Sequence, residues 1–156
     1  MPHTPRFRTA QASDAPAIDR LYRQLVSHPG VNVQAGRIAA LADDPATRLF
    51  VCEQGGAVAG TALVSLCADV MFGRQPYAVV ENFVIDDALR GSGLGSALMA
   101  HIEAFCLAQD CSKIMLLSSA QREAAHRFFA RAGFSGSAKQ GFVKYRSALT
   151  AGGAHA

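Results

Sequence analysis

The chain has 156 residues, 50% of them hydrophobic, which is enough to bury the core of one domain but too few for two. Its formal net charge is +3, with 15 Lys and Arg dispersed among 12 acidic residues. No basic run of the kind found in nucleic-acid-binding arms occurs, so we expect no nucleic-acid partner.

The length, the apolar segments and the cysteines of the chain indicate its domain organisation and cellular compartment. We predict a single domain over residues 1–150 and a flexible tail over 151–156. No cationic start is followed by a long apolar segment, and no run approaches the roughly 18 apolar residues that span a bilayer. The four cysteines (Cys52, Cys67, Cys106 and Cys111) form no C-x-x-C pair, as expected of buried thiols in a reducing compartment. We therefore predict a cytoplasmic protein without a membrane partner.

The N-terminal half of the chain carries short strand and helix signals. Asp14 caps a helix start, and Pro16 lies in its first turn. Gly55 and Gly56 separate two segments of apolar and β-branched residues, which indicates a hairpin. In chain order we predict a strand over 7–10, a helix from 13, a short helix over 34–41, and paired strands over 48–53 and 57–66.

The loop over residues 69–76 has two interpretations. It mixes a carboxylate, a guanidinium and two large apolar side chains, Met71 and Phe72. It could line a substrate cleft, or it could be an ordinary connection whose apolar side chains enter the core.

The most informative stretch runs from Tyr77 to Leu98. The apolar strand YAVVENFVID leads into the turn Arg90-Gly91-Ser92-Gly93-Leu94-Gly95, which opens an amphipathic helix. Closely spaced glycines let backbone N–H groups point at one anion, and the helix N-terminus favours negative charge there. The turn therefore predicts a phosphate-binding cradle.

Two other phosphate loops fit this turn poorly. A P-loop requires a Lys followed by Ser or Thr after its last glycine, whereas Gly95 is followed by Ser96 and Ala97. A dinucleotide fingerprint requires G-x-G-x-x-G and an acidic residue closing the next strand, but the candidate strand KIMLLSS ends in serines.

The C-terminal half of the chain also carries helix and strand signals. The helix after the turn presents an inward stripe of Leu94, Leu98, Ile102 and Phe105 and ends near Gln109. An unbroken apolar centre predicts a parallel strand over 113–119, buried on both faces. A helix over 122–132, ended by Gly133, and a last strand over 142–146 complete the prediction.

Three segments together resemble the GNAT superfamily of N-acetyltransferases. Arg90, Gly93 and Gly95 match its acetyl-coenzyme A loop, R/Q-x-x-G-x-G/A, directly after a strand. AHRFFARAGF is similar to the family's A-x-x-F-Y-x-x-x-G-F signature. The first strand and helix of this chain also resemble the opening strand and helix of family members. The resemblance implies an α/β (α+β) fold: a mixed central sheet of six to seven strands, flanked by about four helices, with central strands that splay apart.

The resemblance also implies where acetyl-coenzyme A binds. The pantetheine would pair with the main chain of the central strand, and the pyrophosphate would lie on the glycine turn. The implied cofactor-binding residues are Phe83, Val84, Ile85, Arg90, Gly91, Ser92, Gly93, Leu94, Gly95, Ser96, Ser119 and Phe129.

For catalysis, Glu81 is the candidate general base, because an alkyl ammonium must lose a proton before it attacks. A structural carboxylate that bonds a backbone N–H or an arginine is the alternative for Glu81. The resemblance implies a backbone oxyanion donor at Val84. Phe129 occupies the position where many members carry a Tyr acid and cannot donate a proton, so water, Ser118, Ser119 or Tyr145 would substitute.

The histidines give weaker functional signals than the glycine turn does. His101 and His126 are expected to be surface or flanking residues, and His28 is an outside candidate for lining the acceptor site. No Cys/His cluster has metal-ligand spacing, so we expect no metal.

The expected activity is acetyl transfer from acetyl-coenzyme A to a primary amine of a small molecule or peptide, by direct attack in a ternary complex. A homodimer is possible. The alternative is an acyl-coenzyme A binding or sensing domain that lost efficient catalysis, for which Phe129 is the main argument. A nucleotide-binding module that uses the same turn is a more remote possibility.

Overall fold

The fold is seen in a computed structural model that describes residues 3–151. Residues 152–156 of the predicted tail lie outside the described residues. The chain divides into two compact units, Met1–Leu116 and Leu117–Ala156, which are treated separately below. The assignment of residues 1–150 to a single domain stays a prediction. No helix in the described part is both long and apolar enough to cross a bilayer.

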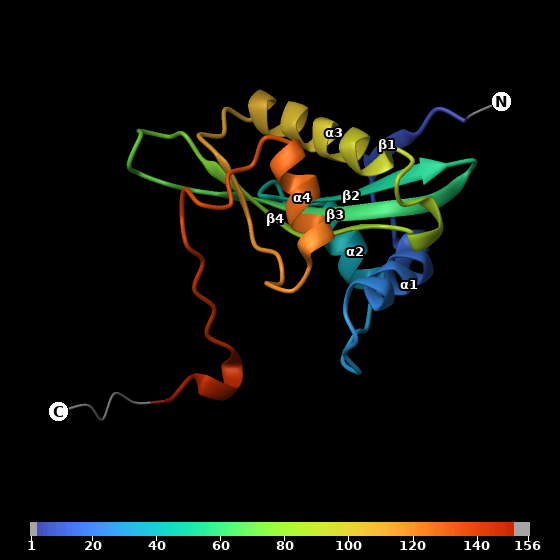
Figure 1. Ribbon diagram of the computed structural model, residues 1–156, viewed down its shortest axis with the longest axis horizontal. Helices are drawn as coiled ribbons and strands as arrows, with labels where there is room; N and C mark the ends of the chain where they lie inside the picture. The colour runs from blue at the N-terminus through green and yellow to red at the C-terminus, as the bar shows by residue number, and fades with distance from the viewer. Residues whose placement is uncertain (1–2, 152–156) are drawn as a thin grey trace. The chain divides into compact units, whose positions relative to one another are not determined.

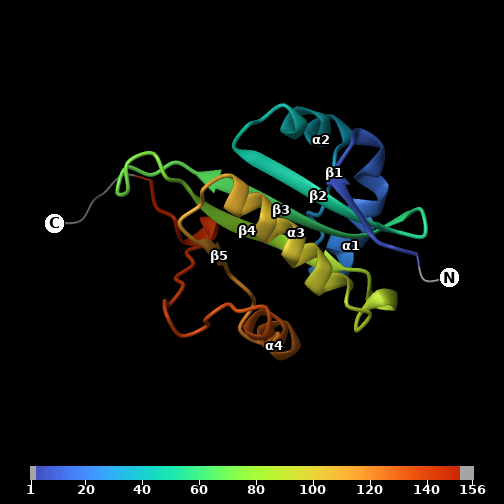
Figure 2. The same cartoon turned by 90° about the horizontal axis from the view of Figure 1, so that it is seen from above.

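The first unit is built on one mixed β-sheet. Its strands follow the order β1-β2-β3-β4-β5 (Figure 2), with antiparallel pairing from β1 to β4 and a parallel pairing of β4 with β5. The β2–β3 connection is a tight turn because Gly55 and Gly56 have φ angles of 60° and 82°. The strands are β1 Arg6–Thr9, β2 Thr47–Gln54, β3 Ala57–Cys67, β4 Tyr77–Ile85 and β5 Ile114–Leu116.

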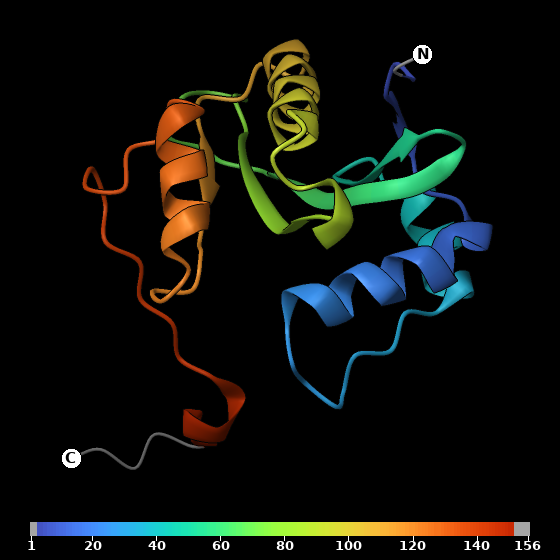
Figure 3. The same ribbon diagram turned by 45° about the vertical axis from the view of Figure 1, so that its right-hand side comes forward.

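Helices cover both faces of this sheet. Helices α1 (Ala15–Leu25) and α2 (Ala35–Ala42) pack on one face, and α3 (Leu94–Ala108) lies on the other (Figures 1 and 3). Short 3₁₀ helices precede α1 (Ala12–Asp14) and α3 (Asp87–Leu89). The crossover from β4 through α3 to β5 is the predicted one, and every helix predicted in this unit is confirmed.

The second unit contains helix α4 (Glu123–Arg131) and a 3₁₀ turn at Arg146–Ala148. Gly133, with a φ angle of 96°, ends α4 as predicted, since this left-handed conformation favours glycine.

The predicted number of six to seven strands is not confirmed, because the described residues contain five. Residues 142–146 are not a strand, and Phe142 and Tyr145 are 86% and 75% exposed. An extended segment becomes a strand only where a neighbour supplies its hydrogen bonds, and this segment has no ladder partner in residues 3–151.

The strand predicted over 113–119 is shorter than expected. It is limited to Ile114–Leu116 and is half-buried rather than buried on both faces, because β5 is an edge strand paired with β4 alone. Cys52 and Cys106 are buried as expected, whereas Cys67 and Cys111 are half-buried; all four are free thiols. Met71 and Phe72 are exposed, so the interpretation that places them in the core is wrong.

A charged network ties the first strand to α1. The Arg8 guanidinium binds both carboxylate oxygens of Asp14 at 2.7 and 2.9 Å and reaches Glu53 at 2.7 Å. Asp14 also accepts the Gln11 N–H at 2.7 Å, which closes the turn before α1. The hydrogen bonds from Arg8 hold the pKa of Asp14 below its ordinary range.

Replacing Arg8 with Met is expected to lower the free energy of unfolding by about 2 to 3 kcal/mol, because two largely buried carboxylates lose their partner. Urea unfolding at neutral pH measures the change. The control is Arg23→Ala, which breaks an exposed i,i+4 pair with Asp19 and should cost about 0.5 kcal/mol or less. Equal losses in the two variants would contradict the structural role of Arg8.

An aromatic cluster joins α3 to the sheet. The His101 ring stacks on Phe7 at 5.0 Å and meets the edge of Phe50 at 4.9 Å. Burial between these rings lowers the pKa of His101, because the charged imidazolium would lose its water.

This burial predicts a pH-dependent stability. The unfolded chain takes up a proton at His101 near the ordinary pKa of about 6.5, while the folded chain resists it until a lower pH. The free energy of unfolding should therefore fall as the pH drops below about 6.5 and level off below the folded-state pKa. A His101→Phe variant should show a flatter dependence in denaturant titrations between about pH 7 and pH 5. An unchanged slope would contradict this assignment.

Candidate active site

The C-terminal half of β4 has an open edge. Strand β5 pairs with β4 only from Ala78 to Val80, whereas β4 continues to Ile85. Within residues 3–151, no strand pairs with the β5-side edge of β4 beyond Val80. Main-chain groups on that edge are therefore available to an extended ligand.

A β-bulge interrupts β4 at the start of this open edge. Ala62 of β3 lies opposite two residues of β4, Asn82 and Phe83, and Asn82 adopts a left-handed φ angle of 54°. The Asn82 side chain hydrogen-bonds the Tyr22 hydroxyl of α1, which partly offsets the rise in the pKa of Tyr22 caused by burial. The interaction links α1 to the strained residue of the bulge.

Sequence reasoning missed this bulge, although a signal was present. Asn is depleted in strand interiors and tolerates left-handed angles, so Asn82 within VVENFVI was the clue.

Glu81 lies directly before the bulge and is exposed. It is opposite Leu63 of β3, whose side chain packs against a cluster that contains Ile18 of α1 and Ile38 of α2. Cross-strand partners share a face, so Glu81 is on the α1–α2 side of the sheet. In the described part of the chain its carboxylate has no hydrogen bond or ion pair, so the structure gives no support to the alternative of a structural carboxylate.

The direction of the backbone distinguishes the two residues of β4 that follow the bulge, Val84 and Ile85. Asp86 donates its N–H to the Ala59 carbonyl of β3 at 2.8 Å. Since main-chain groups alternate in direction along an extended strand, Val84 also faces β3, where Thr61 is its partner. Ile85 therefore faces the open edge. Phe83 lies within the bulge, where this alternation is interrupted.

The glycine turn, for which phosphate binding is predicted, lies directly before α3. Gly91 and Gly93 have φ angles of 79° and 86°, so this backbone path favours glycine at both positions. Gly93 is the N-cap of α3, and no side chain caps the helix. The N–H groups of the first helical turn and the positive end of the helix dipole are thus free of a capping side chain, which suits an anion such as a pyrophosphate.

Arg90, the first residue of the glycine turn, forms an ion pair with Asp87. Its Nη2 atom is 2.6 Å from the Asp87 carboxylate, and both side chains are more than half exposed. Ser92 donates its hydroxyl to the Leu89 carbonyl at 2.6 Å, which closes the turn locally. The side chain of Ser92 therefore shapes the turn, and Arg90 supplies a positive charge beside it.

The remaining predicted residues, Ser119 and Phe129, belong to the second unit. The Ser119 hydroxyl bonds Gln121 at 2.9 Å, and its carbonyl bonds the His126 ring at 2.8 Å. Phe129 packs against Phe128 and Phe134. These contacts are local to the start and the end of α4.

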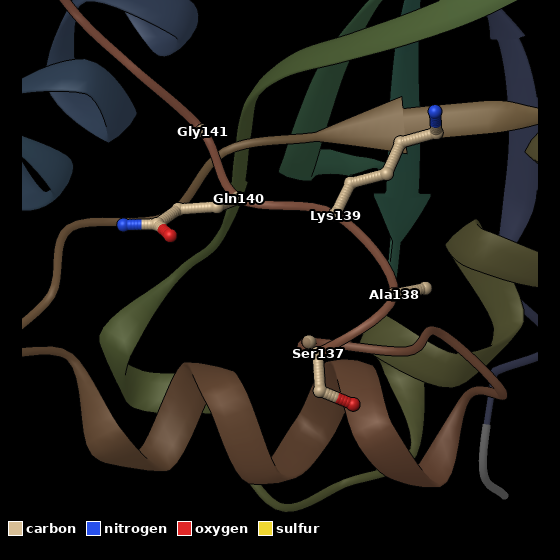
Figure 4. Close-up of a pocket in the computed structure, with 6 residues that line it drawn as sticks. Ser137, Ala138, Lys139, Gln140 and Gly141 are labelled. Carbon is tan, nitrogen blue, oxygen red and sulfur yellow. The ribbon is translucent and has the colours of Figure 1, made fainter.

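The remaining candidates from the sequence are His28, Ser118 and a metal site. The His28 ring accepts the Gly30 N–H at 2.9 Å and so closes its own loop. The buried Ser118 hydroxyl has no hydrogen-bond partner in the described residues. Residues 136–141 line a hollow in the second unit (Figure 4), and none of the predicted site residues borders it. The described residues hold no group of three or more His, Cys, Asp or Glu placed to bind a metal.

Comparisons with known proteins agree with this geometry. A structure from Agrobacterium tumefaciens str. C58 that is described as an acetyltransferase has a TM-score of 0.82 and 30% identity, over 90% of this chain and 99% of its own. Glucosamine-6-phosphate N-acetyltransferase from Arabidopsis thaliana shares the fold with a TM-score of 0.77 at 22% identity, over 92% of this chain and 99% of its own.

A curated relative adds a sequence match. Glucosamine 6-phosphate N-acetyltransferase from Trypanosoma brucei brucei is 28% identical over 94 residues, 60% of this chain, and this chain spans 62% of that protein's length. The profile of the acetyltransferase (GNAT) family matches residues 16–134. An open β4 edge that leads into a glycine cradle, within a match covering most of the chain, means that this protein belongs to the acetyltransferase (GNAT) family.

Proposed function

We propose that this protein transfers an acetyl group from acetyl-coenzyme A to a primary amine by direct attack in a ternary complex. The observation that carries the proposal is the continuity of two binding surfaces on one segment. The open edge of β4 leads directly into the glycine cradle at the N-terminus of α3. A ligand with an extended amide chain joined to a pyrophosphate matches that arrangement.

The residues of the first unit would hold the coenzyme mainly through their backbone. Ile85 faces the open edge and, with Phe83 before it, would pair with the pantetheine amides, whereas the position of Val84 opposite Thr61 makes it a poorer partner. The N–H groups from Gly91 to Ser96 would bind the pyrophosphate, with Arg90 beside it. An oxyanion role for Val84 stays a prediction of the family resemblance.

Glu81 is proposed as the base that removes a proton from the amine. Its exposed carboxylate lies on the strand that carries the open edge and has no partner in residues 3–151. When bound, acetyl-coenzyme A supplies the thioester; the amine nitrogen bonds the acetyl carbon as the carbon–sulfur bond breaks. A thiol has a pKa of about 8.5, so its thiolate can leave without protonation by a strong acid. No other side chain therefore has to supply the proton that Phe129 cannot donate.

For the acceptor, the proposal names a chemical class rather than one compound. The two glucosamine-6-phosphate N-acetyltransferases among the relatives suggest a phosphorylated amino sugar as one panel member. Amino acids, polyamines and peptides with free N-termini complete the panel. The proposal commits only to a primary amine.

Thiol release from acetyl-coenzyme A, scored against this panel, tests the proposal. Amine-dependent release, together with a product heavier than the amine by one acetyl group in mass spectrometry, would support it. Failure to bind coenzyme A in calorimetry, or equal affinity for ATP and NAD, would overturn it.

A second candidate function is an acyl-coenzyme A sensor without efficient turnover. Phe129 favours it, because a side chain that cannot donate a proton stands where many family members have a Tyr. Tight coenzyme A binding without acetylation of any panel amine would favour this candidate.

A further inference from the structure

The outer face of α1 contacts the segment that leads into the cradle. Arg20 Nη1 is 2.6 Å from the Asp86 carboxylate, and Gln24 Oε1 accepts the Asp87 N–H at 2.9 Å. Arg20 and Gln24 are four residues apart, so they lie on the same side of the helix. Both contacts join parts of the chain more than 60 residues apart.

Arg20 is itself held in place. A second guanidinium nitrogen donates to the Val58 carbonyl of β3 at 3.3 Å. The Asp86 N–H donates to Ala59, the next residue of the same strand, at 2.8 Å. Arg20 and Asp86 are therefore both anchored on the end of β3, and the ion pair between them has a defined geometry.

Asp86 and Asp87 in turn organise the approach to the cradle. Asp86 accepts the Ala88 N–H at 3.1 Å and so caps the short 3₁₀ helix, while Asp87 pairs with Arg90 at 2.6 Å. The hydrogen bond from Arg20 holds the pKa of Asp86 below its ordinary range. The contacts of α1 thus reach the residues that position Arg90 and the turn.

Two physical needs of an anion site explain this arrangement. Gly91 and Gly93 leave the turn conformationally free, so a cradle held in its binding geometry needs support from neighbouring elements. Asp86 and Asp87 also place two negative charges directly before a site for phosphate, where they would repel it. Arg20 and Arg90 each neutralise one of them.

We propose that Arg20 and Gln24 are positioning residues for the coenzyme phosphates, acting through Asp86 and Asp87. This inference rests on the proposed function, because it assumes that the cradle binds coenzyme A. It predicts that α1 controls affinity for the pyrophosphate-containing half of the coenzyme and leaves the pantetheine half unaffected.

The test compares coenzyme A with pantetheine, which lacks the pyrophosphate, by calorimetry or competition. The Arg20 side chain of this ion pair is half exposed, and such a pair contributes about 1 kcal/mol, so Arg20→Ala should weaken coenzyme A binding by about fivefold. Its affinity for pantetheine should be unchanged. In turnover, the KM for acetyl-coenzyme A should rise and the KM for the amine should not.

Arg23→Ala is the matched control, because Arg23 is on the same helix and pairs with Asp19 rather than with the cradle segment. It should bind coenzyme A as the unmodified protein does. Asp86→Asn keeps an oxygen for the cap and removes the charge, so its effect and that of Arg20→Ala should not add in the double variant. Thermal unfolding of each variant shows whether it is folded.

The outcomes separate this inference from the proposed function. Tight binding of coenzyme A by the unmodified protein and by Arg20→Ala alike would overturn the role of Arg20. An equal loss for pantetheine, or an equal loss in Arg23→Ala, would also overturn it, because either would indicate a general structural effect. Absence of coenzyme A binding by the unmodified protein would instead overturn the proposed function, and this inference with it.

Discussion

Glu81→Gln is expected to lower kcat by about 10²- to 10⁴-fold near neutral pH, because a primary amine arrives as an ammonium ion and the variant lacks the base that deprotonates it. The substitution keeps the size of the side chain and its place before the bulge. Steady-state kinetics with saturating acetyl-coenzyme A and the best acceptor of the panel measures the loss.

Two further readouts distinguish a base from a binding group. At high pH the amine is already neutral, so the rate of Glu81→Gln should recover toward that of the unmodified enzyme. Affinity for coenzyme A should remain, since the cradle and the edge residues Phe83 and Ile85 are intact. Glu103→Gln, on the exposed side of α3, is the matched control and should keep its kcat. A Glu81→Gln enzyme with unchanged kcat near neutral pH would show that another group, or water alone, accepts the proton.

The second large effect is expected at the cradle. Gly93→Val should weaken coenzyme A binding by about tenfold or more, because a β-branched residue resists the left-handed φ angle of 86° that directs this turn. A Cβ added at Gly93 would meet no atom within 4 Å, so the penalty is expected from the backbone conformation rather than from a clash at that atom. Calorimetric titration with coenzyme A measures the change.

Gly56→Val provides a control with the same kind of strain. Gly56 has a φ angle of 82° in the β2–β3 turn and also has no atom within 4 Å of an added Cβ. Both variants should lose about 1 to 2 kcal/mol of stability, but only Gly93→Val should lose coenzyme affinity. Equal affinities in the two variants would mean that the turn at Gly93 does not bind the phosphates.

Much of the site could be predicted from local sequence. The path from β4 through the glycine turn into α3 follows from an apolar run, alternate glycines and a helical stripe, each read within a few residues. The hairpin at Gly55 and Gly56 is equally local, since only a turn with positive φ angles requires that pair.

Other features depend on partners that are distant in the chain. Residues 142–146 have a strand-like composition, yet without a ladder partner in the described residues they are not a strand. Strand β5 is half-buried because it is at the edge of the sheet, and its apolar sequence does not report that position. The exposure of Met71 and Phe72 was likewise left open by the loop sequence.

By itself the sequence determined the glycine turn before α3, the helices, the first four strands and the resemblance to the acetyltransferases, because these rest on spacings between neighbouring residues. Only the tertiary structure decided that Ile85 faces the open edge and that Arg20 of α1 forms an ion pair with Asp86. Strand register and contacts between distant segments set these features. They depend on which residues meet in space, and no local pattern in the chain encodes that.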